Sequence, residues 1–370
     1  MKVVYILSDI DKALAFEWIA ERLDKRKFDL SFILILQHPS QLEQFLTEEG
    51  ISCISFYYKS KKDLPKVFVR VYSELKKQRP AIVHCHLLYG SLIGLTAAKL
   101  AGIKKRIYTR HHSDFHHRYF PKGIKWDKWC NHLATGIVAP SGAVREVLLQ
   151  FEKVPDKKIA VIHHGFDLAY FAEPFQDRIA ALRIKYGVEG KYPVIGVISR
   201  FTVLKGIQYI IPAFRQVLET YPDALLMFFG AQGDYEKELK TMLGEIPAKN
   251  YCIVAFENDL SSVYHLFDAF VQVSIDRTIE AFGQTYVEAL AAGIPSVFTL
   301  SGIANDFIRD GENALVVPYK DADAIFRALS QLVSNLPLRN KLSLNGKKIV
   351  KEQFELQTMV QKLEQLYESV

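Results

Sequence analysis

Short runs of aliphatic and β-branched residues recur along the first half of the chain, and each is short enough to predict a β-strand. Amphipathic segments with apolar residues at helical spacing fill most of the gaps, for example in residues 64–75. The predicted strands are 3–7, 28–36, 51–56, 82–86, 106–111, 137–139 and 159–163. Alternation of strands with helices predicts a parallel sheet with helices on both faces.

The pattern weakens between residues 168 and 192, where prolines and glycines interrupt it, and a second series of strands then begins. The runs of the second series are 194–199, 225–229, 253–256, 269–273, 295–299 and 314–317. A chain of 370 residues exceeds the usual size of one domain. We therefore expect two parallel-sheet domains, 1–185 and 186–352, followed by a C-terminal helical segment, 353–370.

Composition and charge narrow the class of protein. The net charge of +6 divides into +11 for residues 1–185 and −5 for residues 186–370. No apolar run approaches the roughly 20 residues that span a bilayer, and the first residues read as a short strand rather than a cleavable signal. We therefore expect a cytoplasmic location. The scattered cysteines are expected to be reduced: Cys53, Cys85, Cys130 and Cys252.

The sharpest chemical signal is a pair of carboxylates, Glu280 and Glu288, that follows a predicted strand and runs into an alanine-rich helix. Glu280 falls in the loop, and Glu288 lies about two turns inside the helix. Gly283 at the helix start leaves backbone N–H groups open, where the helix dipole favours phosphate.

This segment resembles the E-x-F/Y-G-x4-E motif of the family 4 glycosyltransferases. The resemblance implies that Glu280 lies by the donor sugar and that Glu288 holds the ribose hydroxyls. It makes Phe282, Gly283 and Gln284 further donor-binding residues. It also implies a GT-B fold, in which two Rossmann-like domains face each other across a cleft and the last helix crosses back to the first domain.

A second segment, 199–206, is similar to the R-x4-K-G motif of the same family. In that family the two cations hold the donor diphosphate, which assigns this task to Arg200 and Lys205. Two fixed cations neutralise charge that develops on the leaving nucleotide, as metal ions do in other transferases. We therefore expect no metal requirement and no cofactor beyond the sugar nucleotide.

Histidines follow three predicted strands of the first domain, and this spread favours structural or substrate contacts over one metal site. His86 matches the H-x-H strand end of the family. His111 matches a strand-end histidine that contacts the donor sugar near its anomeric carbon, which makes it a catalytic candidate. The neighbouring His112 leaves the register open by one residue.

The first loop departs from the family, which has two glycines where this chain reads Ser8-Asp9-Ile10-Asp11-Lys12-Ala13. Asp11 and Lys12 are retained as acceptor-side candidates. The D-x-D pattern comes too early for a metal site, before a nucleotide-binding unit has been built, and is interpreted as turn and cap chemistry.

The implied activity is retaining transfer of a hexosyl or N-acetylhexosaminyl group from a nucleotide diphosphate sugar to a hydroxyl acceptor, in polysaccharide or glycolipid assembly. Two alternatives stay open: a non-hydrolysing nucleotide-sugar epimerase, and a non-catalytic binding module. The signatures of dinucleotide oxidoreductases and P-loop enzymes are absent, and no nucleic-acid partner is expected.

The basic first half also suggests where the acceptor is found. Lysines and aromatic residues interleave in residues 119–129, a mixture suited to a lipid headgroup region. Further lysines and arginines follow residue 58. We expect a peripheral enzyme on an anionic membrane surface with a lipid-linked or saccharide acceptor, although solvated basic helices are common in soluble proteins.

Overall fold

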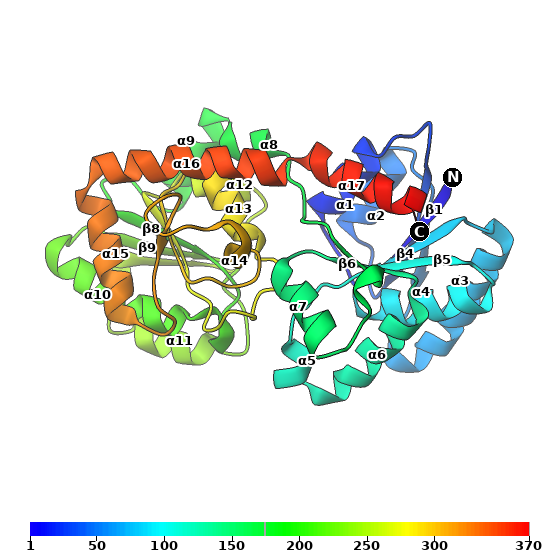
Figure 1. The fold of residues 1–370 in the computed structure, drawn as a ribbon. Coiled ribbons are helices and arrows are strands. Elements are labelled where there is room, and N and C mark those ends of the chain that lie inside the picture. The colour runs from blue at the N-terminus through cyan, green and yellow to red at the C-terminus, as the bar shows by residue number, and fades with distance from the viewer. Residues whose placement is uncertain (174, 370) are drawn as a thin grey trace. The chain divides into compact units, whose positions relative to one another are not determined.

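The computed structural model describes residues 1–173 and 175–369, which form two compact α/β units (Figure 1). The first comprises Met1–Phe166 and the C-terminal segment from Leu356 on, and the second comprises Asp167–Glu355. The sequence predicted the change of domain nearer residues 185 and 352. The first boundary lies earlier, after Phe166, because α8 (Leu168–Ala172) and α9 (Gln176–Lys185) both pack on α12 (Leu260–Tyr264) of the second unit.

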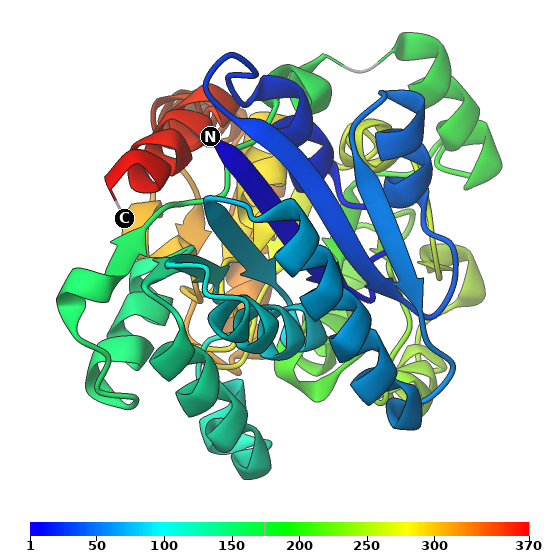
Figure 2. The ribbon, with the colours of Figure 1, turned by 90° about the vertical axis from the view of Figure 1, so that its right-hand side faces the viewer.

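The first unit is a seven-stranded parallel sheet with the order β3-β2-β1-β4-β5-β6-β7 and helices on both faces (Figure 2). Its strands are β1 (Lys2–Ser8), β2 (Asp29–Leu36), β3 (Cys53–Tyr57), β4 (Ile82–His86), β5 (Lys105–Thr109), β6 (Gly136–Ala139) and β7 (Ile159–Val161). Its helices are α1 (Leu14–Arg22), α2 (Gln41–Glu48), α3 (Leu64–Gln78), α4 (Leu88–Leu100), α5 (Phe115–Arg118), α6 (Ile124–Leu133), α7 (Gly142–Gln150) and α17 (Leu356–Ser369).

The C-terminal helix α17 belongs to the core of this first unit. Its side chains Leu356, Met359, Val360 and Leu363 join one apolar cluster with residues of β1 and β2. The hydroxyl of Tyr367 lies 2.5 Å from that of Tyr5 in the central strand β1. Burial of such side chains contributes roughly 1.5–3 kcal/mol each, so α17 is an integral part of the unit.

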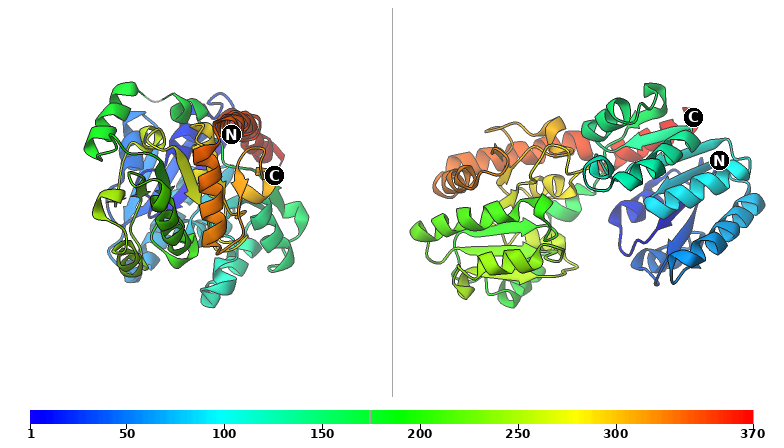
Figure 3. Two further views of the ribbon diagram at one scale, coloured as in Figure 1. Left: turned by 90° about the vertical axis from the view of Figure 1, so that its left-hand side faces the viewer. Right: turned by 90° about the horizontal axis from the view of Figure 1, so that it is seen from below.

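The second unit is a six-stranded parallel sheet with the order β10-β9-β8-β11-β12-β13 (Figure 3). Its strands are β8 (Val194–Ile198), β9 (Leu225–Phe229), β10 (Tyr251–Val254), β11 (Ala269–Gln272), β12 (Ser296–Phe298) and β13 (Leu315–Val316). Besides α8, α9 and α12, its helices are α10 (Ile207–Thr220), α11 (Glu236–Leu243), α13 (Gln284–Ala291), α14 (Ala304–Phe307), α15 (Ala322–Ser334) and α16 (Leu336–Phe354).

Both sheets reverse their strand order at one point. In the first unit β1 lies beside β4, and in the second β8 lies beside β11. The connections on either side of such a point run in opposite directions, which leaves a crevice at the carboxyl ends of the two strands where ligands bind. Residues that follow β1, β4, β8 and β11 are therefore placed for function.

In the described part of the chain, no helix is long and apolar enough to cross a membrane. The four cysteines are free thiols; Cys85 and Cys130 are buried, whereas Cys53 and Cys252 are partly exposed.

Candidate functional site

In the second unit, Arg200 and Lys205 lie on the segment that leaves the carboxyl end of β8. A short 3-10 helix, Val203–Lys205, leads into α10 through Gly206. Gly206 has a φ of +72°, and a Cβ there would lie 1.9 Å from the carbonyl oxygen of Val273, which follows β11. Only glycine therefore allows this segment to approach β11 so closely.

The close approach brings Lys205 to Glu280. The ammonium group of Lys205 donates to Oε1 of Glu280 at 2.5 Å, and the hydroxyl of Ser274 donates to the same oxygen at 2.7 Å. The backbone N–H of Glu280 donates to Oγ of Ser301, which follows β12, at 3.1 Å. Two of the residues predicted from separate motifs thus form one cluster at the strand ends.

The Glu280 carboxylate is held in its charged form. Burial by itself would raise the pKa of Glu280, but Lys205, Ser274 and Arg200 together outweigh burial, and the pKa falls below its ordinary value. Arg200 is exposed, whereas Lys205 and Glu280 are largely covered. The cluster therefore presents an exposed cation, Arg200, beside a fixed carboxylate.

The residues between the two carboxylates form the start of α13. Gly283 has a φ of +91°, and a Cβ at this position would lie 2.7 Å from the ring of Tyr286, so glycine is required. Gln284 begins the helix and is exposed. The side chain of Phe282, a predicted donor-binding residue, is buried and packs against Phe354 with ring centroids 6.0 Å apart.

Glu288 lies one turn inside α13, on the side that faces α12. Its Oε2 accepts a hydrogen bond from the hydroxyl of the buried Tyr264 at 2.7 Å. Burial raises the pKa of Glu288 to about 7, and the hydrogen bond from Tyr264 opposes this rise. A ligand that donates hydroxyl hydrogens to Glu288 would favour the ionised form.

In the first unit, the predicted histidines gather at the carboxyl ends of β4 and β5. Nδ1 of His86 lies 3.2 Å from Nε2 of His111, and the ring of His111 stacks on that of His164 with centroids 6.0 Å apart. His86 is 4% exposed, so it orients His111 and is not itself open to a ligand. His111 is partly exposed and takes the position that the motif predicts.

These histidines are neutral. Burial is the first cause in each case: it lowers the pKa of His111 to about 3 and that of His164 to about 4, and neighbouring imidazoles add to the effect. The pKa of His86 is likewise well below its ordinary value. A neutral His111 has one ring nitrogen that donates a hydrogen bond and one that accepts, but it carries no positive charge.

The two aspartates of the first loop accept hydrogen bonds from other segments of the first unit. Asp11 Oδ1 accepts from the backbone N–H of Gln41 at 3.0 Å, at the start of α2. Asp9 has a φ of +47° and accepts from the hydroxyl of Tyr58 at 2.7 Å. Asp11 and Lys12 are both exposed; the Asp11 carboxylate is already used, which weakens its case as an acceptor contact.

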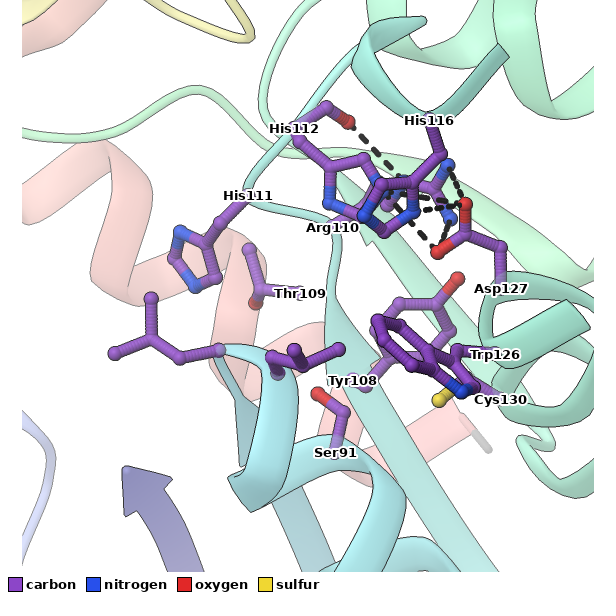
Figure 4. A pocket seen from close by; sticks show the side chains of 12 residues that line it. Ser91, Tyr108, Thr109, Arg110, His111, His112, His116, Trp126, Asp127 and Cys130 are labelled. Carbon is purple, nitrogen blue, oxygen red and sulfur yellow. Dashed lines mark hydrogen bonds and ion pairs between the residues drawn. The ribbon is translucent and has the colours of Figure 1, made fainter. Parts of the chain in front are cut away.

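A pocket of about 230 Å³ lies beside His111 in the first unit, and the sequence did not point to it (Figure 4). Among its lining residues His112, His116 and Asp127 place one ligand atom each within 4.8 Å of one another, a set that could hold a metal ion. The spacing of His112 and His116, four residues apart, was the available signal. The sequence did not reveal the set of three, because His112 and His116 follow β5 whereas Asp127 belongs to a separate helix, α6.

Both parts of the chain match models of protein families. Residues 179–349 match the model described as glycosyl transferases group 1, and residues 18–170 match the model described as glycosyltransferase family 4. Together the two models cover most of the chain and meet close to the boundary between the two units.

Curated relatives and solved structures extend this likeness to full length. The capsular polysaccharide biosynthesis glycosyltransferase CapM of Staphylococcus aureus is 25% identical, over 92% of this chain and 90% of its own. The UDP-Gal:alpha-D-GlcNAc-diphosphoundecaprenol alpha-1,3-galactosyltransferase of Escherichia coli is 24% identical, over 99% and 95%. The crystal structure of Anabaena HepE in complex with UDP-glucose superposes with a TM-score of 0.86 at 19% identity, covering 100% of both chains.

Proposed function

Since this chain belongs to family 4 of the glycosyltransferases and has the GT-B fold, we propose that it transfers a sugar from a nucleotide diphosphate to a hydroxyl acceptor with retention at the anomeric carbon. Family membership favours a transferase over the two alternatives, the epimerase and the binding module. The observation that carries the assignment is the cluster of Lys205, Glu280 and Ser274 at the ends of β8 and β11.

We place the donor on the second unit. The diphosphate lies against Arg200 and Lys205 and the N-terminus of α13, where positive charge and open N–H groups coincide. Glu280 accepts from hydroxyls of the donor sugar, and Glu288 accepts from the ribose diol. UDP-glucose in the Anabaena structure makes uridine diphosphate sugars the first donors to test.

We infer the following course for the reaction. The bond between the anomeric carbon and the diphosphate oxygen breaks, a bond to the acceptor oxygen forms on the same face, and the acceptor proton passes to the departing phosphate oxygen. Arg200 and Lys205 stabilise the charge that builds on the leaving group, so no divalent cation is needed. The family resemblance assigns His111 to the donor sugar near its anomeric carbon.

We further propose a membrane-associated acceptor in polysaccharide or glycolipid assembly. In the first unit, a surface that we call the aromatic–basic patch combines lysines with aromatic side chains that are 36–48% exposed. Its members are Phe115, Tyr119, Phe120, Lys122, Lys125, Trp126, Lys128 and Trp129. The basic helix α3 packs on α4, as α6 does. The E. coli relative, whose name includes diphosphoundecaprenol, supports a lipid-linked acceptor.

The donor can be identified directly by a thermal-shift screen of nucleotide sugars. A ligand at 100 times its dissociation constant adds about 2.7 kcal/mol of stability, which raises the melting temperature measurably. The proposal expects a nucleotide diphosphate sugar to stabilise the protein more than the matching nucleoside monophosphate. Lys205→Ala should remove most of that difference, because the lost contact is to the diphosphate. Equal stabilisation of the wild-type protein by both nucleotides would contradict the proposal.

A further inference from the structure

The pocket beside His111 is formed within the first unit by four segments. The start of α4 contributes Leu87, Leu88 and Ser91, and the end of β5 leads to His112. Helix α5 contributes His116, and α6 contributes Trp126. The motifs that point to donor binding do not use these residues, with the exception of His111. At about 230 Å³ the pocket is smaller than the roughly 300–1,000 Å³ of sites for drug-sized ligands, so it suits a group the size of one ring.

Asp127 organises one wall of this pocket. Its two carboxylate oxygens lie 3.0 Å from NH1 and NH2 of the buried Arg110, and it accepts from Nε2 of His112 at 3.1 Å and from Nδ1 of His116 at 2.7 Å. A carboxylate has about four lone-pair positions, so these donors fill them. Figure 4 shows the two imidazoles side by side, with Asp127 on one side of them and His111 on the other.

This arrangement fixes the tautomer of His112. Because Nε2 carries the hydrogen that Asp127 accepts, Nδ1 of the neutral ring carries a lone pair. Burial, the first cause, and Arg110 lower the pKa of His112, and this outweighs the opposing effect of Asp127, so the ring is neutral at pH 7. The partly exposed His112 therefore offers the pocket a hydrogen-bond acceptor.

The charges nearby select against an anionic ligand. Arg110 is shared between two buried carboxylates, Asp127 and Glu152, with Glu152 Oε1 2.5 Å from its NH2. A phosphate in the pocket would meet this surplus of negative charge. A neutral group whose hydroxyls donate hydrogen bonds, and whose C–H face packs on Trp126 and the leucines, fits both the polar and the apolar walls.

We infer that this pocket binds the sugar ring of the acceptor, with Nδ1 of His112 accepting a hydrogen bond from one of its hydroxyls and Asp127 acting as the positioning residue. The inference rests on the proposed function, because His111, which lines the same pocket, is there assigned to the donor's anomeric carbon. Trp126 belongs to both the pocket and the aromatic–basic patch, so a lipid tail or linking phosphate of the acceptor extends outside the pocket toward Lys122 and Lys125.

Metal binding is the competing use of the same side chains. A divalent cation held by His112, His116 and Asp127 would lie against the Arg110 guanidinium, which already occupies both Asp127 oxygens. Full-length protein titrated with Zn²⁺ is expected to bind no stoichiometric ion at these residues. Tight binding that His116→Gln abolishes would overturn the inference, since the imidazole nitrogens would then be ligands.

The direct test uses octyl glucoside, octyl galactoside and octyl N-acetylglucosaminide below their micelle concentrations, with octyl phosphate as the anionic comparison, in saturation-transfer NMR. At least one glycoside should receive saturation transfer at the protons of its sugar ring, and octyl phosphate should not compete with it for binding. His112→Ala should weaken binding about fivefold to tenfold, the loss of one hydrogen bond. His112→Asn should recover part of it, because its amide oxygen lies near the position of Nδ1. His132→Asn is the matched control, because His132 is an exposed histidine of the first unit that does not line the pocket.

Kinetics separate this inference from the proposed function. His112→Ala should raise the KM for the acceptor and leave donor KM and slow donor hydrolysis by water unchanged. Asp127→Asn, checked for folding by circular dichroism, should also raise the KM for the acceptor. If His112→Ala keeps a normal acceptor KM, or no glycoside binds, the pocket assignment fails while donor turnover still supports a glycosyltransferase. Absence of any donor turnover would instead contradict the proposed function.

Discussion

The ammonium group of Lys205 lies 2.5 Å from Oε1 of Glu280, although the two residues are 75 positions apart in the chain. The parallel sheet explains the meeting, because Lys205 follows β8, Glu280 follows β11, and these strands are neighbours. An anion that engages Lys205 must compete with Glu280 or share the cation with it. The pair therefore links the phosphate side of the proposed donor site to its sugar side.

Substitutions at this pair should affect the chemical step. Glu280→Gln and Lys205→Ala are each expected to lower kcat by at least about 100-fold, since both act on charge that develops in the transition state. Steady-state rates of nucleotide release at saturating donor measure this effect. Lys237→Ala, an exposed lysine of α11 in the same unit, is the control. Near-normal kcat in either correctly folded variant would remove that residue from the site.

The pKa of Glu288, raised to about 7, predicts a pH dependence of donor binding. Ribose hydroxyls donate to the ionised carboxylate, so the donor binds better as pH rises through 7 and Glu288 loses its proton. Between pH 6 and pH 8 the affinity for a nucleotide sugar should rise about tenfold. Calorimetry on wild type and on Glu288→Gln provides the comparison; the variant should bind more weakly and show a flat profile. A wild-type affinity that falls with pH would contradict the role.

Metal removal should leave activity intact. Arg200 and Lys205 supply the charge that a divalent cation supplies in other transferases, so extensive treatment with EDTA should change the rate less than about twofold. Rates before and after gel filtration in EDTA make the measurement. Loss of activity that Mn²⁺ or Mg²⁺ restores would mean that a metal has a role in the reaction.

The aromatic–basic patch should bind anionic vesicles. Each lysine near an anionic leaflet contributes up to about 1 kcal/mol, and exposed Tyr119 and Trp129 add apolar contact. Sedimentation with vesicles of graded anionic lipid content should show binding that weakens at high salt. The double variant Tyr119→Ser, Trp129→Ser should bind less, and Phe175→Ser, an exposed aromatic of the second unit, should not. Protein that stays in the supernatant at low salt would point to a soluble acceptor.

Much of the fold could be predicted because buried parallel strands are short, continuous apolar runs. The predicted run 269–273, for example, matches β11 to within one residue. The motifs also placed Lys205 and Glu280 after predicted strands, and the structure shows that these strands, β8 and β11, are neighbours. The burial of the Phe282 side chain was not predicted, because a motif does not say which side chains point into the core. The pocket around Asp127 was not predicted because its walls join segments from α4, β5, α5 and α6, and hydrophobic periodicity along the chain does not reveal such contacts.

The stereochemistry of the product tests the central claim most directly. Wild-type protein is incubated with the donor identified by thermal shift and the octyl glycoside that binds best, and the new linkage is examined by proton NMR. The account predicts that the anomeric configuration of the α-linked donor is kept, giving the small coupling of an axial–equatorial proton pair in a gluco- or galacto-configured sugar. A β-linked product, with the large coupling of two axial protons, would contradict it.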